Sequence, residues 1–501
     1  MRTGAPASLL ALLALLLLAP GFAARQRWSQ FRGPAGGGVA ADEHAYPARL
    51  SVEDNLAWRV ELPPGHSSPS VWDERVFVTG CDGKELVTLC LERATGALLW
   101  RRAVEVEALE RTHDVNGPAS PTPAVDGERV YAYFGSFGLL AYDLDGEERW
   151  RRPLEAPDNT FGSAASPVLA DGRLFFLHDS SGASFLEAIE PATGRTLWRR
   201  ERPDFGSGWS TPTVWRRPGG AELLVYGVGW LMAYDPASGA PLWSVPGLAD
   251  EPIVTPVAGA GLVFVSSYNM RTNPEVEGLP EFDALLREHD ADGSGTLDAR
   301  EAEGNRSVLS RFDADGEGDH PLRIFFRFLD ADRDGELTRE EWPKLVRWVE
   351  SFQQANGVLA IRPPGKAGEA EPDAAQPEIA WQADVGVPEC PSPLCYDGLL
   401  FVVKNGGMAS CYDAASGTLR YRGRLGARGP CYASPVAGGG RIYTASARGV
   451  VTVLAAGDEL QVLSQQDLGE RVLATPALAG GFVYVRTESA LYAFGPEEDG
   501  D

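Results

Sequence analysis

The stretch SPTPAVDGERVYAYFGSFGLLAYDLDGEERW, residues 120–150, decides the fold. It contains two β-rich runs, RVYAYF and LLAYDL, which are separated by turn residues and followed by a last run that ends in Trp150. The stretch opens on a Ser-Pro pair, and proline is tolerated at the first residue of a strand. One such unit predicts four short antiparallel strands, the pattern of a propeller blade.

The same unit recurs along the 501-residue chain. Six of the seven intervals between successive openings are 41–52 residues long, which indicates a repeat architecture. The eight openings are Ser68-Pro69, Ser120-Pro121, Ser166-Pro167, Thr211-Pro212, Thr255-Pro256, Ser392-Pro393, Ser434-Pro435 and Thr475-Pro476.

Most units also close alike, with a turn that contains Gly followed by a tryptophan. We expect these side chains to pack between neighbouring blades, where burial contributes about 2–3 kcal/mol each. The closing residues are Trp100, Trp150, Trp198 and Trp243, with Tyr421 and Leu463 at the same place in two later units.

The last unit, ATPALAGGFVYVRTESALYAFG at residues 474–495, stops after three strands. The missing strand is expected near the other end of the chain, where residues 55–62 carry Trp58 at the last-strand position. Pairing the two ends closes the ring and removes open sheet edges. The sequence therefore predicts an all-β, eight-bladed β-propeller closed by residues 55–62.

The Ser/Thr-Pro openings, the TGxxxW closings and the N-terminal WSQFRGP (residues 28–34) resemble the pyrroloquinoline-quinone-like (PQQ-like) β-propeller repeat proteins of exported bacterial type. The resemblance covers residues 28–272 and 356–495. It implies membership of one of two branches. One branch consists of quinoprotein dehydrogenases, and the other of non-catalytic propellers similar to the lipoprotein that helps to assemble outer-membrane barrels.

The interval from Thr255 to Ser392 is 137 residues long, because an acidic, helical insertion interrupts blade five. Residues 290–301 (DADGSGTLDARE) and 330–341 (DADRDGELTREE) each follow the EF-hand pattern, with a glycine at the sixth position and a glutamate at the twelfth. Such a loop supplies the six to eight oxygens that calcium requires. The predicted ligands of two Ca²⁺ ions are Asp290, Asp292, Ser294, Thr296, Asp298 and Glu301 in the first loop and Asp330, Asp332, Asp334, Glu336, Thr338 and Glu341 in the second.

Helices are expected before each loop and after the second, and Leu297 and Leu337 are expected to pair on a short strand between the loops. A third acidic stretch from Asp313 has Ile324 where the final carboxylate should be, so we interpret it as a linker. A permanently occupied structural site is favoured outside the cytoplasm. The rival interpretation is a switch that exposes Phe325, Phe326 and Trp342 to a partner.

The N-terminus predicts export. Residues 1–23 carry Arg2, an apolar run from Leu9 to Leu18 and small residues at the expected cleavage site, with no cysteine to accept a lipid. No later segment predicts a transmembrane helix, so a periplasmic or secreted protein is expected. The predicted organisation is a signal peptide at 1–23, propeller at 24–272, EF-hand pair at 273–355, propeller again at 356–495 and a tail at 496–501.

A formal charge of −25 argues against a nucleic-acid partner, because phosphate binding relies on Lys and Arg. Six cysteines in an exported chain are compatible with disulfides, and Cys81 and Cys90, which flank one predicted hairpin, are the favoured pair. The other pairings stay open.

Residues just before the Ser/Thr-Pro openings are expected at the channel mouth, where a ligand would bind. These candidates are His66, Asn116, Trp209, Glu389, Tyr432 and Arg471. The chain lacks the adjacent cysteine pair and the haem motif of the quinoprotein dehydrogenases that it resembles, and no other catalytic arrangement is evident. The sequence therefore favours a non-catalytic propeller that binds a protein or a small ligand. The alternative is a PQQ-dependent dehydrogenase of alcohols or sugars.

Overall fold

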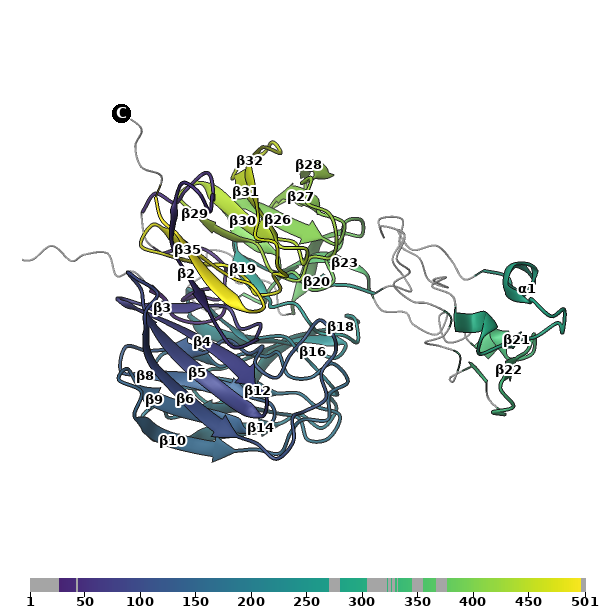
Figure 1. Ribbon diagram of the computed structural model, residues 1–501, viewed down its shortest axis with the longest axis horizontal. Helices are drawn as coiled ribbons and strands as arrows, with labels where there is room; N and C mark the ends of the chain where they lie inside the picture. Colours follow the sequence, from purple (N-terminus) through teal and green to yellow (C-terminus); the bar gives the residue numbers. More distant parts are fainter. Residues whose placement is uncertain are drawn as a thin grey trace, which may run out of the picture.

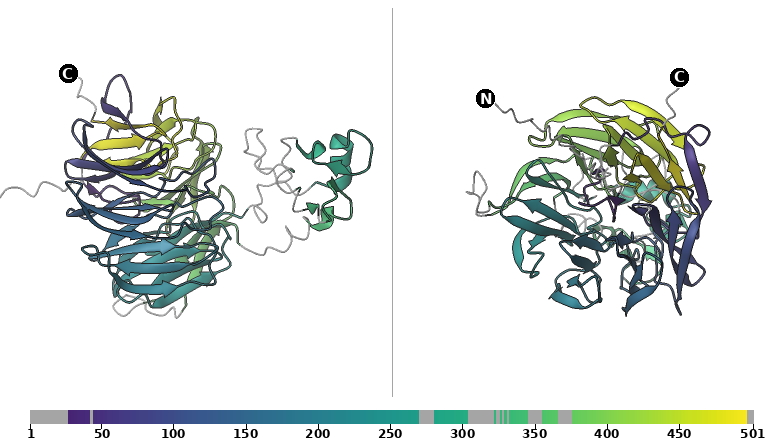
Figure 2. Two further views of the ribbon diagram at one scale, coloured as in Figure 1. Left: turned by 60° about the horizontal axis from the view of Figure 1, so that its bottom comes forward. Right: turned by 90° about the vertical axis from the view of Figure 1, so that its left-hand side faces the viewer.

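The protein was examined as a computed structural model that describes residues 27–41, 44–269, 280–303, 322, 326, 329–330, 332–344, 355–365 and 376–496. Eight antiparallel sheets surround a central axis, as Figures 1 and 2 show. The first strands of neighbouring sheets contact one another round this axis. The predicted all-β, eight-bladed propeller is confirmed.

Each blade contains four strands in the order inner to outer, and the first blade gains a fifth. Blade one contains β1 (Arg27–Trp28), β3 (Ser70–Trp72), β4 (Arg75–Asp82), β5 (Glu85–Glu92) and β6 (Leu98–Glu105). Blade two contains β7 (Ala124–Val125), β8 (Arg129–Phe134), β9 (Gly138–Asp143) and β10 (Glu148–Pro153). Blade three contains β11 (Val168–Ala170), β12 (Arg173–His178), β13 (Phe185–Ile189) and β14 (Thr196–Glu201). Blade four contains β15 (Thr213–Arg217), β16 (Gly220–Gly227), β17 (Trp230–Tyr234) and β18 (Pro241–Pro246).

The other four blades follow the same order. Blade five contains β19 (Val257–Gly259), β20 (Leu262–Ser267), β23 (Gly357–Arg362) and β24 (Glu378–Ala383). Blade six contains β25 (Leu394–Tyr396), β26 (Leu399–Lys404), β27 (Met408–Asp413) and β28 (Leu419–Arg424). Blade seven contains β29 (Val436–Gly438), β30 (Arg441–Ala445), β31 (Val450–Ala455) and β32 (Val462–Asp467). Blade eight contains β33 (Ala477–Ala479), β34 (Phe482–Arg486), β35 (Ala490–Phe494) and β2 (Leu56–Glu61).

The ring closes as the sequence predicts. Strand β2 pairs antiparallel with β35, and Trp58 lies opposite Ala493. The outermost strand of the last blade thus comes from the N-terminal part of the chain. Because β2 supplies the outer strand of blade eight, that blade has all four strands and the ring is closed.

The hydroxyl groups of the openings form a chain of hydrogen bonds round the axis. The backbone N–H of the Ser or Thr in one blade donates to the side-chain hydroxyl of the corresponding residue in the next, at 2.9–3.0 Å. In blade two the residue that takes part is Thr122, not Ser120, so the predicted opening at Ser120-Pro121 is two residues out of register. The six observed links run from Ser68 to Thr122, Thr122 to Ser166, Ser166 to Thr211, Thr255 to Ser392, Ser392 to Ser434 and Ser434 to Thr475.

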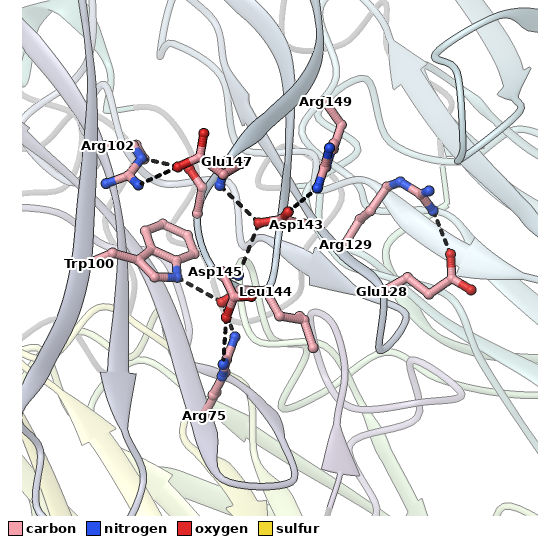
Figure 3. Close-up of polar contacts among 11 residues, drawn as sticks. Arg75, Trp100, Arg102, Glu128, Arg129, Asp143, Leu144, Asp145, Glu147 and Arg149 are labelled. Atoms are coloured by element: carbon pink, nitrogen blue, oxygen red, sulfur yellow. Dashed lines mark hydrogen bonds and ion pairs between the residues drawn. The ribbon is translucent and has the colours of Figure 1, made fainter.

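The closing tryptophans dock onto the next blade. Figure 3 shows Trp100 of blade one with its Nε1–H donating to the carbonyl oxygen of Leu144 in blade two, at 2.9 Å. A Cβ atom at Gly146 would lie 2.8 Å from the indole ring, so only glycine allows this approach. Ion pairs from Arg75 to Asp145 and from Arg102 to Glu147 flank the ring.

This joint recurs, which confirms the predicted packing role of the tryptophans. It also includes Trp381 of blade five, which the sequence pattern did not identify. The other indole-to-carbonyl pairs are Trp58 with Arg93, Trp150 with Pro191, Trp198 with Pro236 and Trp381 with Ala414.

The joint between blades four and five differs. Trp243 Nε1–H donates to the buried carboxylate of Glu222 in its own blade, at 3.0 Å. Glu222 also pairs with Arg217 at 2.8 Å, and Arg217 donates to the carbonyl of Pro364 in blade five. A buried ion pair therefore links these two blades, where five other joints use an indole and a glycine.

The predicted Cys81–Cys90 disulfide is wrong. All six cysteines have free thiols. In the β4–β5 hairpin Cys81 lies opposite Leu86 and Cys90 lies opposite Phe77, four rungs away. Four rungs correspond to about 13 Å along a strand, well beyond the reach of a disulfide. Burial also raises the pKa of the Cys90 thiol to about 12.

Between β20 and β23 the chain forms a separate helical element, drawn beside the propeller in Figure 1. It contains α1 (Phe282–His289), β21 (Leu297–Asp298), the 3-10 helix η1 (Glu301–Glu303) and β22 (Glu336–Leu337). The predicted boundary at 273, the signal peptide, most of the tail and most of the linker from Asp313 lie outside the described residues, whereas Ala355 is described at the start of the segment that leads into β23. All of these domain bounds stay predictions.

Candidate metal centre and propeller mouth

The first acidic loop folds round the carboxylate of Asp290. Its Oδ1 accepts a hydrogen bond from the N–H of Gly293 at 2.8 Å, and its Oδ2 accepts one from Gly295 at 2.9 Å. Gly295 has φ +81°, the left-handed conformation that the sharp bend of a calcium loop requires. One oxygen from each of Asp290, Asp292 and Glu301 lies within 4.8 Å of the other two. The loop thus gathers three carboxylates.

The second loop repeats this arrangement. Asp330 Oδ2 accepts a hydrogen bond from Gly335 at 3.2 Å, and Gly335 has φ +91°. Oxygens of Asp330, Asp332 and Asp334 also lie within 4.8 Å of one another. Asp330 Oδ1 is buried and has no hydrogen-bond partner. Because a buried carboxylate oxygen is costly without a partner, this atom fits a bound cation.

The other predicted ligands bond within or between the loops. Asp298 Oδ1 accepts from the N–H of Glu301 at 2.9 Å, and Thr338 Oγ1 donates to Glu341 Oε2 at 2.8 Å. Thr296 Oγ1 donates to Glu336 Oε2 in the opposite loop at 3.0 Å. Ser294 contacts Thr296. Six of the twelve predicted ligands therefore converge in two groups of three, and the ligand roles of all twelve stay predictions.

The two loops are joined as predicted. Leu297 pairs with Leu337 in the two-stranded sheet β21–β22. Behind this sheet lies an apolar core that includes Phe326 and Trp342, both buried, whereas Phe325 lies outside the described residues. The whole core consists of Phe282, Leu285, Leu297, Ala302, Leu322, Phe326, Leu329, Leu337 and Trp342. The pair of loops is thus one packed unit.

The propeller mouth contains an open cavity of about 420 Å³. Among the predicted mouth residues, Tyr432 and Arg471 line it. The pKa of the His66 imidazole is lowered to about 4, first by burial and then by the charges of Arg486 and Arg471. His66 therefore lies near Arg471. Other lining residues are Val115, Pro430, Arg448 and Glu470.

The remaining mouth candidates are occupied by structural contacts. Asn116 Nδ2 donates to the carbonyl of Phe161 at 2.7 Å, and the buried Trp209 donates to that of Gly162 at 2.8 Å. Glu389 accepts a hydrogen bond from Asn405 at 3.1 Å. The structure does not gather these three side chains with Tyr432 and Arg471.

A mouth loop, residues 106–117 between β6 and β7, reaches the cavity. Arg471, in the connection between blades seven and eight, donates to the carbonyl of Asp114 in this loop at 3.1 Å. Glu110 anchors the loop by accepting from Ser163 Oγ at 2.8 Å. Burial raises the pKa of Glu110 to about 7, although the hydrogen bonds from Ser163 lower it. Sequence reasoning missed Glu110, because only the fold buries it.

The N-terminal segment fills the inside of the ring. Ser29 O accepts from Val125 N in blade two, and Arg32 donates to Pro393 O beside blade six at 2.6 Å. Gly38 O accepts from Ala437 N in blade seven at 2.7 Å. These contacts place the segment against inner strands on several sides of the axis.

A quinone held over calcium would need carboxylate ligands beside the mouth. Within the described residues, groups of three His, Cys, Asp or Glu that could hold a metal occur only in the two acidic loops. At the mouth, both oxygens of Glu470 accept hydrogen bonds, from Thr487 and Ser489. Among the residues that line the cavity, the carboxylate oxygens are thus those of Glu470, and both are engaged.

No helix among the described residues has the length and apolar character to cross a membrane. Comparison with curated proteins finds no match. A family model described as EF hand matches residues 322–346, which include the second acidic loop.

Solved structures share the propeller fold. BamB from Moraxella catarrhalis is 12% identical, with a TM-score of 0.50 over 89% of this chain and 100% of that one. The quinohemoprotein alcohol dehydrogenase from Comamonas testosteroni is 14% identical, with a TM-score of 0.54 over 95% and 82%. A europium-containing methanol dehydrogenase is 12% identical, with a TM-score of 0.53 over 94% and 98%. At these identities the likeness concerns the fold alone.

The family assignment comes from the repeats themselves. A family model described as outer membrane protein assembly factor BamB matches residues 48–201, 183–284 and 370–488, more than half of the chain. These ranges contain most of the strands and all of the Trp–Gly joints described above. The chain therefore belongs to the family of PQQ-like repeat propellers described as outer membrane protein assembly factor BamB.

Proposed function

We propose that this protein is an exported, calcium-binding propeller that serves as a binding scaffold rather than as a catalyst. The observation that carries the proposal is the composition of the mouth, where an open cavity of about 420 Å³ is lined by two arginines, one tyrosine, apolar residues and a single carboxylate, Glu470, whose oxygens both accept hydrogen bonds. Cavities of this size suit binding of a ligand or of a peptide segment. Kinship with BamB supports a role in binding other proteins.

Retention of PQQ distinguishes this proposal from the alternative, a PQQ-dependent dehydrogenase of alcohols or sugars. The protein is incubated with PQQ and Ca²⁺ and passed over a gel-filtration column, and dye reduction is then measured with alcohols and sugars. A scaffold loses the quinone on the column and reduces no dye. Stoichiometric retention with turnover would establish the dehydrogenase instead.

Export is the second part of the proposal. Cleavage after about residue 23 would leave a mature chain that starts shortly before β1. Mass spectrometry of the N-terminal peptide from the periplasm or the medium tests this. Recovery of an intact N-terminus from the cytoplasm alone would contradict it.

Calcium binding in both loops is the third part. Two groups of three carboxylates, with one orphaned buried oxygen, support it. Calorimetric titration of the full chain should detect two Ca²⁺ sites, and Glu301→Gln with Glu341→Gln should abolish them. Glu340→Gln is the matched control, because Glu340 is exposed and lies next to Glu341 outside the predicted ligand set. Unchanged binding in the double variant would refute these ligands.

A further inference from the structure

Two arginines form the charged side of the mouth cavity. Arg448 and Arg471 are both exposed there, one from the β30–β31 turn and one from the connection into blade eight. In the part of the chain that the structure describes, neither forms an ion pair, and the one hydrogen bond found for Arg471 goes to the Asp114 carbonyl. Each guanidinium thus keeps donors that can reach a ligand.

The neighbouring carboxylate, Glu470, offsets part of this positive charge, but its oxygens face other partners. Glu470 Oε2 accepts from Thr487 Oγ1 at 2.6 Å, and Oε1 accepts from Ser489 N at 2.8 Å. Although partial burial raises its pKa, these hydrogen bonds produce a net lowering, so Glu470 is ionised and held toward blade eight. Its oxygens are therefore committed to structure.

A further positive charge lies near the mouth residue His66. Arg486 is fully buried and donates to the carbonyl of Pro63 and to Ser67 Oγ, with no carboxylate partner among the described residues. Burial lowers its pKa to about 9, so it stays charged at neutral pH. His66 experiences the charges of both Arg486 and Arg471. Arg448, Arg471 and Arg486 thus outnumber Glu470, the one carboxylate that lines the cavity, in a chain whose net charge is −25.

We infer that the cavity binds a carboxylate of an extended acidic peptide segment, with Arg448 and Arg471 contacting the carboxylate and Val115, Pro430 and Tyr432 contacting the neighbouring side chains. Arginine is suited to this role because its fork of N–H donors matches a carboxylate. The apolar walls favour a peptide over a simple anion. The surrounding negative charge repels acidic partners elsewhere, so the arginines of the mouth fix where such a segment docks.

This inference rests on the proposed scaffold function, and the test uses the full chain in calcium-containing buffer. Fluorescence anisotropy measures binding of a labelled peptide, Leu-Glu-Leu-Asp-Leu-Glu, and of its uncharged counterpart, Leu-Gln-Leu-Asn-Leu-Gln. The variants are Arg448→Gln and Arg471→Gln. Arg216→Gln is the matched control, because Arg216 is an exposed arginine on blade four that pairs with Asp171. Circular dichroism verifies that each variant is folded.

We expect the acidic peptide to bind, the uncharged one not to, and each mouth variant to weaken binding about 10-fold while Arg216→Gln has no effect. Raising the salt concentration should weaken binding as well. Equal binding of both peptides, or unchanged binding in the mouth variants, would overturn the inference. Glutarate that binds as tightly as the peptide would also overturn it, by reducing the site to one for small carboxylates.

The quinone experiment separates the two failures. If neither PQQ nor the acidic peptide binds, the peptide site is refuted and a scaffold that binds elsewhere still stands. If PQQ is retained with turnover, the scaffold function itself is refuted, whatever the peptide does.

Discussion

The propeller and its insertion satisfy their polar groups in opposite ways. In the propeller, the hydroxyls of the blade openings and the indoles of the joints bond to neighbouring blades, as in the Ser68–Thr122 link and the Trp100–Leu144 joint. In the insertion, carboxylates converge in two groups, and Asp330 Oδ1 is left without a partner. The comparison teaches that the ring is held by bonds between segments far apart in the chain, whereas each acidic loop gathers carboxylates from one short segment.

The largest expected effect comes from breaking a joint of the ring. Trp100→Ala removes a buried indole that fills the space over Gly146, and large-to-small core changes of this kind cost about 3–5 kcal/mol. Denaturant unfolding measures the free energy of unfolding. Trp230→Ala is the control, because that ring is 40% exposed and should cost far less. Equal losses would mean that the joints do not hold the blades.

Removing calcium should affect the insertion next most strongly. At a free Ca²⁺ concentration 100 times the dissociation constant, binding stabilises the folded loops by about 3 kcal/mol. Chelation should therefore lower the thermal midpoint of the helical signal at 222 nm and leave the β signal of the propeller in place.

The same chelation experiment tests the rival switch. Because Phe326 and Trp342 are buried in the core of the insertion, we expect chelation to increase the binding of a hydrophobic dye. A switch requires the reverse, more exposed apolar surface with calcium than without it.

The repeat was predictable from sequence because most blades contain the same turn followed by a tryptophan. The strand that closes the ring was predictable for the same reason, since Trp58 stands where the last unit lacks its partner. The acidic loops were predictable because a calcium loop fixes residue types at fixed spacing. Periodicity thus identified both the propeller and the twelve candidate ligands.

The rest depends on contacts between distant segments. Glu222 accepts a hydrogen bond from Trp243 Nε1 because the pairing of β16, β17 and β18 brings its buried carboxylate to the indole. Glu110 becomes a buried group only because the mouth loop folds against Ser163. The cysteine pair was mispredicted because the hairpin register, which the sequence does not state, sets Cys81 and Cys90 four rungs apart.

Glu110 is a buried carboxylate of the propeller, and its titration sharpens the comparison. Its Oε1 is buried without a hydrogen bond, and its pKa is raised from 4.5 to about 7. The folded state therefore binds this proton more tightly than the unfolded state does. The stability that it contributes is complete below pH 4.5, falls as the pH rises toward 7 and is absent above it.

Glu110→Gln should abolish the loss of stability that the wild type shows as the pH rises from 4.5 to 7. The variant should be about 2–3 kcal/mol more stable than the wild type at pH 8, with little difference at pH 4. Chemical unfolding across this pH range measures the difference. Glu107→Gln, an exposed change in the same mouth loop, should follow the wild-type profile. If Glu110→Gln also follows that profile, Glu110 does not titrate abnormally in the folded protein.

The smallest expected change in stability tests whether Thr122 or Ser120 is the residue of blade two that corresponds to the openings of the other blades. Thr122→Val keeps the shape of the side chain but leaves the buried N–H of Ser68 without its acceptor, which costs about 1–2 kcal/mol. Ser120→Ala should cost less than about 0.5 kcal/mol, because the N–H of Gly117 still donates to Asn116 Oδ1 at 2.8 Å. The difference in the free energy of unfolding between the two variants is the measurement. A larger loss of unfolding free energy for Ser120→Ala than for Thr122→Val would favour the Ser120-Pro121 opening that the sequence pattern predicts. It would also mean that the hydroxyl links do not stabilise the ring.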